Sequence, residues 1–254
     1  MIRGMGYLFL LVCALGVEAA PLTSADLVNL SGRQRMLSQR IVKAYVQVGT
    51  KVAPDQSRQI LGDSVDQFSS QLAQLRAIIT KPEQKLVLME IERLWPDVQG
   101  LASKTASREL APALQERANE LQTLCHRLAG LIENDAGLAI GRLVNVAGRQ
   151  RMLSQRLAKA YMLRAWGVDS PQLGEELESS RLEFSAALQL LAQASENTPE
   201  IRHELDLIVS QWAWFQTALE LEGAFSYRLL VADSSESMLA NLEKLVTLYT
   251  RLGK

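Results

Sequence analysis

The sequence predicts an all-α protein built from two tandem up-down four-helix bundles. Its 254 residues contain only 7 Pro and 15 Gly, and these fall mostly outside long stretches with helical hydrophobic spacing. A seventeen-residue segment occurs at 29–45 and again at 145–161, with thirteen identical positions that include the unbroken core GRQRMLSQR. Hydrophobic residues downstream of each copy recur at nearly the same spacing, so the duplication covers a whole four-helix unit.

The first twenty residues have the pattern of a secretory signal peptide. Arg3 supplies the basic start, residues 7–17 are apolar, and Val17-Glu18-Ala19 fits a small-x-small cleavage site. The apolar run is shorter than the roughly 20 residues of a membrane span. We therefore expect residues 1–20 to be cleaved and the protein to be periplasmic. An uncleaved anchor is the alternative.

Residues 21–136 form the first expected unit. Ser24 or Asp26 is placed to cap a helix that continues to about Val48. Three further helices follow, separated by a break at 49–55, by the Lys81-Pro82 pair and by a break at 102–107. The third helix of the unit opens at Lys81-Pro82, since proline is well placed in a first turn. The fourth is expected from about Arg108.

Residues 137–254 form the second expected unit, with breaks at 167–171, 197–199 and 232–235. No proline lies between Ala113 and Ser170, so the last helix of the first unit can continue into the first helix of the second. A continuous helix would stack the two bundles end to end as a rod, which is the arrangement we expect. A bend within 133–141, which contains Gly137 and Gly141, would instead place the units side by side.

The duplicated segment predicts a helix whose polar face has a function of its own. Its apolar stripe changed conservatively between the copies, as in Leu30 and Val146, whereas the polar face stayed constant. Glycine leaves room for close approach, and the clustered arginines suit a small anion. The alternative is a packing or dimerisation motif whose arginines pair with carboxylates. The predicted ligand-binding residues are Gly32, Arg33, Arg35, Gln39 and Arg40 in the first copy and Gly148, Arg149, Arg151, Gln155 and Arg156 in the second.

The pattern N-x-x-G-R-Q-R-M-L-S-Q-R resembles the first helix of the PilJ / NarX-like sensor domain. This domain forms the periplasmic part of nitrate/nitrite sensor kinases and of type IV pilus chemotaxis transducers, and the resemblance covers essentially the whole mature chain as two copies. In the nitrate-sensor branch an arginine just before the methionine binds the anion at a symmetric helix–helix interface. The resemblance implies this role for Arg35 and Arg151. The residues flanking them look more like the pilus-transducer branch.

Other function classes lack support in the sequence. A net charge of −1 argues against bulk nucleic-acid binding. The two histidines, His126 and His203, belong to no catalytic or metal-binding motif, so we expect no enzymatic activity, no cofactor and no metal. Cys125 is the only cysteine outside the signal segment, which excludes a disulfide within the mature chain.

The resulting hypothesis is a periplasmic sensory protein. A small anion such as nitrate or nitrite would bind between Arg35 and Arg151, relieve their repulsion and shift one helix relative to the other. The output would pass to a membrane-bound receptor, kinase or cyclase, and the protein could act as a homodimer. The alternative is a structural or adaptor protein whose repeated faces bind another receptor ectodomain without a small ligand.

Overall fold

The computed structural model describes residues 22–136, 139–221 and 223–253. The described residues are all-α, as predicted, and no helix among them combines the length and hydropathy needed to cross a membrane. The predicted signal peptide lies outside the described residues. The helices are α1 (Ser24–Gly49), α2 (Pro54–Ile78), α3 (Pro82–Ala102), α4 (Ala111–Ala136), α5 (Ala139–Ala165), α6 (Pro171–Ala192), α7 (Pro199–Glu220) and α8 (Phe225–Leu252).

Local sequence explains where most of these helices begin. Thr23 caps α1 in a capping box, because its hydroxyl accepts from the backbone N–H of Asp26 while the Asp26 carboxylate accepts from the backbone N–H of Thr23. Ser170 and Thr198 cap α6 and α7 in the same N-cap position. A proline opens α2, α3, α6 and α7, where its missing N–H costs no helical hydrogen bond.

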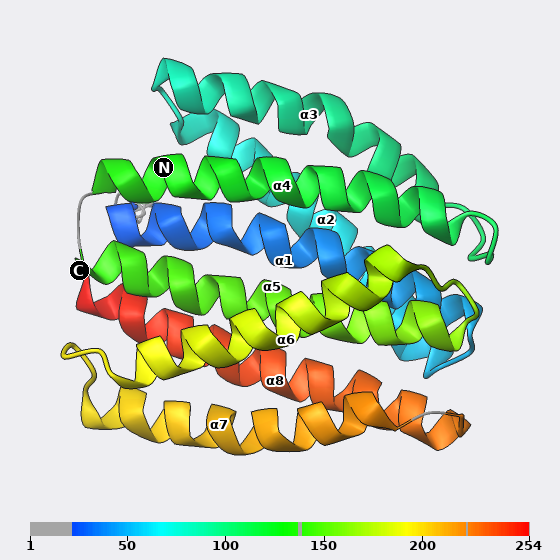
Figure 1. Ribbon diagram of the computed structural model, residues 1–254. Coiled ribbons are helices and arrows are strands. Elements are labelled where there is room, and N and C mark those ends of the chain that lie inside the picture. Colours follow the sequence, from blue (N-terminus) through cyan, green and yellow to red (C-terminus); the bar gives the residue numbers. More distant parts are fainter. Residues whose placement is uncertain (1–21, 137–138, 222, 254) are drawn as a thin grey trace, which may run out of the picture.

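The two units lie side by side, so the expected end-to-end rod is wrong. Helices α4 and α5 are separate elements, and α1 packs along α5. Figure 1 shows α4, α1, α5 and α8 lying next to one another, with α3 and α7 at the two outer edges. Folding back buries the duplicated face of each repeat against the other, which a rod would leave in water.

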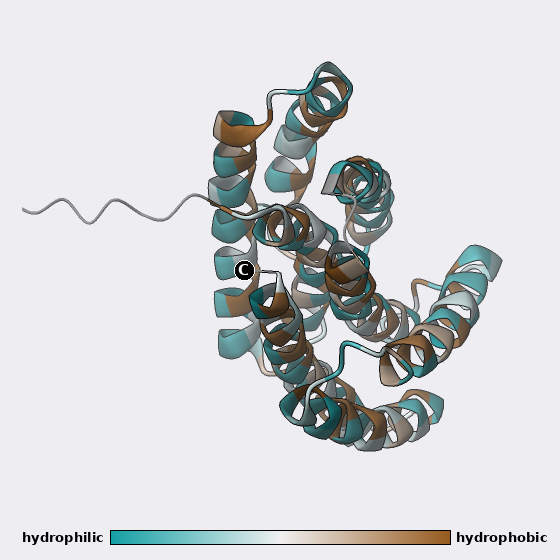
Figure 2. Cartoon of the chain, turned by 90° about the vertical axis from the view of Figure 1, so that its left-hand side faces the viewer, coloured by the Kyte–Doolittle hydropathy of each residue, from teal (hydrophilic) through white to brown (hydrophobic). Residues whose placement is uncertain are grey.

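The helices of each unit pack around its first helix, and the buried hydrophobic residues of the two units join in one continuous core. Helix α1 packs on α2 and α4, and α5 packs on α6 and α8 in the corresponding way. Phe68 stacks on Trp95 with ring centroids 4.1 Å apart, and Phe184 stacks on Trp212 at 4.2 Å. Figure 2 shows that every helix carries both hydrophobic and hydrophilic residues, as expected for amphipathic helices in a bundle.

The predicted break at 232–235 is wrong, because these residues lie inside α8. The chain turns instead between α7 and α8, where Gly223 has a φ of 93°, a conformation that favours glycine. Ser235 does not interrupt the helix, since its hydroxyl donates to the carbonyl of Ala232.

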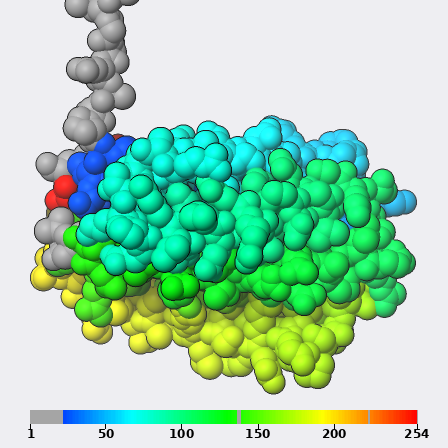
Figure 3. Space-filling model, turned by 90° about the horizontal axis from the view of Figure 1, so that it is seen from above, coloured from blue at the N-terminus to red at the C-terminus, as the bar shows by residue number. Residues whose placement is uncertain are grey.

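Helices α1 and α5 are therefore central and are covered on both faces. Their hydrophobic stripes face their own units, and their polar stripes face each other across the α1–α5 contact. Figure 3 shows the molecule from the α3 side, where α2, α3 and α4 cover the surface and α6 emerges at the opposite edge.

Candidate functional site: an arginine cluster between α1 and α5

Arg35 lies on α1 and reaches across to α5. Its side chain is fully buried, at 0% exposure. Nη2 donates to the side-chain oxygen of Asn145 at 2.6 Å, and Nε donates to the carbonyl of Gly32 at 3.3 Å. Nη1 lies 3.2 Å from Nδ1 of His126 on α4. Among the described residues, Arg35 makes no ion pair with a carboxylate.

Arg151 on α5 repeats this arrangement in the opposite direction. It is also fully buried, and its Nη2 donates to the side-chain oxygen of Asn29 at 2.9 Å. Its Nη1, however, donates to the carboxylate of Glu243 on α8 at 2.7 Å. Arg33 donates to the same carboxylate through Nη2 at 2.5 Å and through Nε at 3.1 Å.

These contacts are related by an approximate two-fold axis between α1 and α5. Arg35 and Arg151 occupy equivalent positions in the duplicated segment, and each binds the asparagine that opens the other copy. The two copies in one chain therefore form an internal pseudo-dimer, which places two like-charged guanidinium groups at one interface.

The glycines provide the space that the guanidinium groups occupy. A Cβ atom on Gly32 would lie 2.9 Å from Nη2 of Arg35. A Cβ atom on Gly148 would lie 3.2 Å from Nη2 of Arg151 and 3.6 Å from Nη2 of Arg35. Both guanidinium groups thus converge on the backbone of Gly148.

Burial and the neighbouring arginines lower the pKa of Arg35 to about 9. Desolvation is the largest cause, followed by the positive charges of Arg149 and Arg151. Burial also lowers the pKa of Arg151, but there the carboxylate of Glu243 opposes the effect. The interface therefore holds more positive charge around Arg35 than its partners neutralise by contact.

His126 receives two guanidinium groups without offering a negative charge. Nη1 of Arg149 lies 3.1 Å from its Nδ1, which also faces Arg35. Burial and these arginines lower the pKa of His126 to about 4, so the ring is neutral at pH 7. Arg149 is held from its other side by the carboxylate of Glu183, to which Nη2 donates at 3.0 Å.

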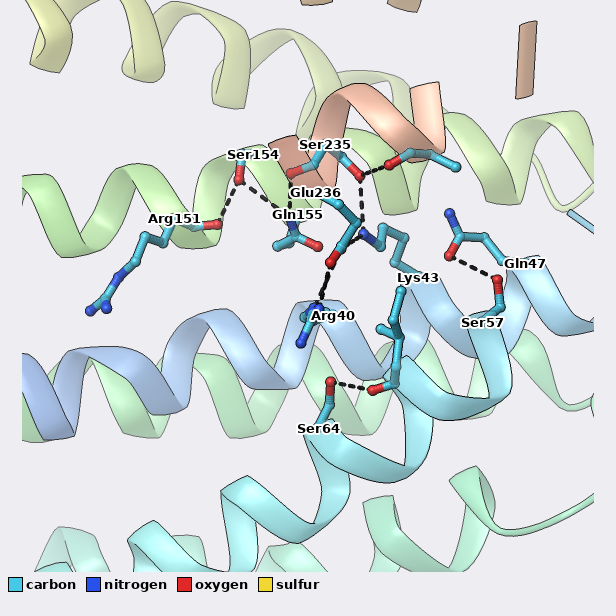
Figure 4. A network of polar contacts seen from close by, with 12 residues as sticks. Arg40, Lys43, Gln47, Ser57, Ser64, Arg151, Ser154, Gln155, Ser235 and Glu236 are labelled. Atoms are coloured by element: carbon cyan, nitrogen blue, oxygen red, sulfur yellow. Dashed lines mark hydrogen bonds and ion pairs between the residues drawn. The ribbon is translucent and has the colours of Figure 1, made fainter. Parts of the chain in front are cut away.

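A second polar layer lies further along the same interface and is shown in Figure 4. Lys43 on α1 is fully buried, donates to the hydroxyl of Ser235 at 3.0 Å and pairs with the carboxylate of Glu236 on α8. Arg40 binds the same carboxylate at 2.5 Å. These two cations, opposing the effect of burial, hold the pKa of Glu236 at about 2.

The equivalent layer around α5 uses different acceptors. Lys159 is fully buried, donates to the side-chain oxygens of Gln39 at 2.8 Å and Asn119 at 3.1 Å, and pairs with Glu176 on α6. Arg156 lies 3.4 Å from the same Glu176 carboxylate. Gln155 donates to the backbone carbonyl of Ser235 at 3.0 Å.

The structure thus brings all ten predicted ligand-binding residues to the α1–α5 region, but in two layers. Arg33, Arg35, Arg149, Arg151 and the two glycines form the first layer, and the glutamines, Arg40 and Arg156 form the second. Sequence reasoning missed His126 and Glu243. Comparing α4 with α8 in register would have found them, because Glu243 lies 117 residues after His126 and the buried positions of the two helices match at that spacing.

Comparison with known families agrees with this duplicated architecture. The family model described as the N-terminal region of the type IV pili methyl-accepting chemotaxis transducer, PilJ, matches residues 21–123 and 137–243. Each match starts just before a central helix and includes one copy of the duplicated segment. No similar curated protein and no similar solved structure was found. The match supports a role in sensory signalling.

Proposed function

We propose, from the premise that this chain belongs to the PilJ family in two tandem copies, that it is a periplasmic sensory protein. It binds a small anion at the arginine cluster between α1 and α5 and signals through a partner membrane receptor. The observation that carries the proposal is the convergence of two fully buried guanidinium groups on Gly148.

The energetics of the cluster favour an anion. Two guanidinium groups that share a buried interface repel each other, and Arg35 has only neutral hydrogen-bond partners among the described residues. A bound anion adds charge-assisted hydrogen bonds and removes part of this repulsion. Because the guanidinium groups come from different helices, anion binding favours one relative position of α1 and α5 over others. A receptor that contacts the paired units would respond to that shift.

A thermal-shift screen with nitrate, nitrite and other small anions tests the proposal. Binding is expected to raise the melting temperature of the wild-type chain. The increase should disappear in Arg35→Met and Arg151→Met, in which an apolar side chain of similar length replaces the buried cation. Arg58→Ala is the matched control, because this exposed arginine on α2 forms an ion pair with Asp55 one turn earlier and should keep the full response.

One observation favours a second candidate, an adaptor that binds another helical ectodomain. Trp214 on α7 is 78% exposed, and Leu207 and Val209 on the same helix are also exposed. Loss of receptor capture in Trp214→Ala, together with no thermal response to any anion, would replace the sensory proposal with this one.

A further inference from the structure

The arginine cluster consists of two half-sites that differ in one acceptor. The first half-site is Arg35, Arg149 and His126, and the second half-site is Arg151, Arg33 and Glu243. The arginines are equivalent between the two copies of the duplicated segment. Where the second half-site has the carboxylate of Glu243 between its two guanidinium groups, the first has the neutral imidazole of His126.

An imidazole cannot satisfy the donors that face it. Nη1 of Arg35 lies 3.2 Å from Nδ1 of His126, and Nη1 of Arg149 lies 3.1 Å from both Nδ1 and Nε2 of the ring. A neutral ring offers one lone pair on one of these nitrogens, whereas a carboxylate offers about four acceptor positions on two oxygens. Glu243 uses both of its oxygens, accepting from Arg33 at Oε1 and from Arg151 at Oε2. The first half-site therefore has the donors of a carboxylate site without the carboxylate.

The first half-site can also be reached from solvent. The His126 side chain lies at the surface of α4, partly exposed and partly covered by the two arginines, and the Arg149 side chain is 28% exposed. Rotation of an exposed side chain takes only picoseconds to nanoseconds. An outward turn of the His126 ring would remove its contact with Nη1 of Arg35 and free the place that the ring occupies.

We propose that the first half-site is the one that binds ligand, and that it takes a small planar monoanion with two coplanar oxygens, a carboxylate or nitrate-type ion, in place of the His126 ring. The Glu243 carboxylate permanently fills the equivalent place in the second half-site. This inference rests on the proposed function and adds the location and chemical class of the ligand.

The second half-site explains the choice of ligand class. There the equivalent guanidinium groups donate to the Glu243 carboxylate, which is planar, carries one negative charge and has two oxygens. Arg149 already has the Glu183 carboxylate on its other side. Arg35 has no carboxylate in contact among the described residues, and the Glu133 carboxylate acts on it only from beyond Asn145, from which it accepts a hydrogen bond. One charge is therefore sufficient, and a tetrahedral dianion would be both larger and opposed by Glu183.

Isothermal titration of the full mature chain with acetate, nitrate and sulfate at matched ionic strength tests the proposal. The wild-type chain is expected to bind one acetate or nitrate ion, with sulfate weaker. His126→Glu copies Glu243 into the first half-site and should weaken acetate binding by about tenfold or more. This variant should also melt at a higher temperature without ligand. Thr123→Glu is the matched control for the added charge, because Thr123 is exposed on α4 one turn before His126 and lies outside the half-site. It should keep acetate binding.

The reverse exchange tests the second half-site. Glu243→His should create a second binding site and raise the stoichiometry to two. If this variant does not fold, the paired responses of His126→Glu and Thr123→Glu still decide the question. Binding that survives in His126→Glu but disappears in Arg151→Met would overturn this inference and leave the proposed function standing. Absence of binding by any anion to the wild-type chain would reject both.

Discussion

The two repeats share their buried cations but not the carboxylates around them. Arg35 and Arg151 occupy equivalent positions, as do Lys43 and Lys159, and all four side chains are fully buried. Lys43 forms an ion pair with Glu236 of α8. Lys159 instead donates a hydrogen bond to Asn119 of α4 and forms its ion pair with Glu176 of α6. Duplication thus produced a symmetric set of cations and an asymmetric set of acids.

This difference is informative because the positions of the cations and the acids that neutralise them come from different parts of the sequence. The guanidinium positions follow from the repeated glycines, asparagines and arginines, which are identical in the two copies. The carboxylates lie on the outer helices, where the repeats have diverged. A change on α4 or α8 can therefore alter one half-site without moving the other.

The largest expected effect is from removing the internal acid of the second half-site. Glu243→Gln leaves Arg151 buried without a carboxylate and should lower the free energy of unfolding by about 3 kcal/mol. His126→Gln, at the equivalent position of the first half-site, should change it by less than about 1 kcal/mol. Urea unfolding of the two variants measures both values. Equal losses would mean that the half-sites do not differ in charge compensation.

Lowering the pH should destabilise the chain by protonating Glu236. Asn119, the equivalent residue of the first unit, does not titrate and should contribute nothing to this pH dependence. The pKa of Glu236 is about 2 in the folded chain, below its ordinary value of 4.5. Its stabilising effect, on the order of 2 kcal/mol, is therefore present above pH 4.5 and is lost as the pH falls toward 2. Glu236→Gln should flatten the pH dependence of unfolding in that window, whereas Asn119→Ala should leave the slope unchanged. A slope that persists in Glu236→Gln would contradict this assignment.

A methyl group on the duplicated glycine should disturb the guanidinium that lies over it. Gly32→Ala brings Cβ to 2.9 Å from Nη2 of Arg35, which three partners hold in place, and should cost about 1 kcal/mol of stability. Gly62→Ala is the matched control. No atom lies within 4 Å of its added methyl group, so better helix propensity should stabilise the chain by up to about 1 kcal/mol. Thermal melting of the pair separates crowding from propensity.

The smallest effect concerns His126. Its pKa in the folded chain, about 4, lies below the ordinary 6.5, so folding disfavours the protonated ring. Stability should therefore decline as the pH falls from about 6.5 to about 4, because the unfolded chain takes up the proton first. His126→Gln should remove this part of the decline, which melting temperatures measured across the window will show. An unchanged profile would mean that Arg35 and Arg149 do not act on the ring.

Much of the fold was predictable because it depends on local pattern. Turn residues and helix caps placed six of the eight helices near their observed starts. The start of α5 was expected inside a continuous helix, and the final break at 232–235 was misplaced. The pairing of Arg35 with Arg151 across an interface was also anticipated, on the strength of the family resemblance. Pairing of the arginines with carboxylates was considered as the alternative, but the acids themselves were not identified, because Glu243, Glu236 and Glu176 lie outside the duplicated segments along the chain.

By itself, the sequence determined that the chain is helical, that it is duplicated, and that each copy carries the same glycine, asparagine and arginine face. These properties follow from spacing and composition within single helices. The tertiary structure alone decided that the units fold back side by side, because burying one polar face requires a second face to satisfy its donors. That contact also decided that Glu243 neutralises Arg151 while Arg35 is left with His126.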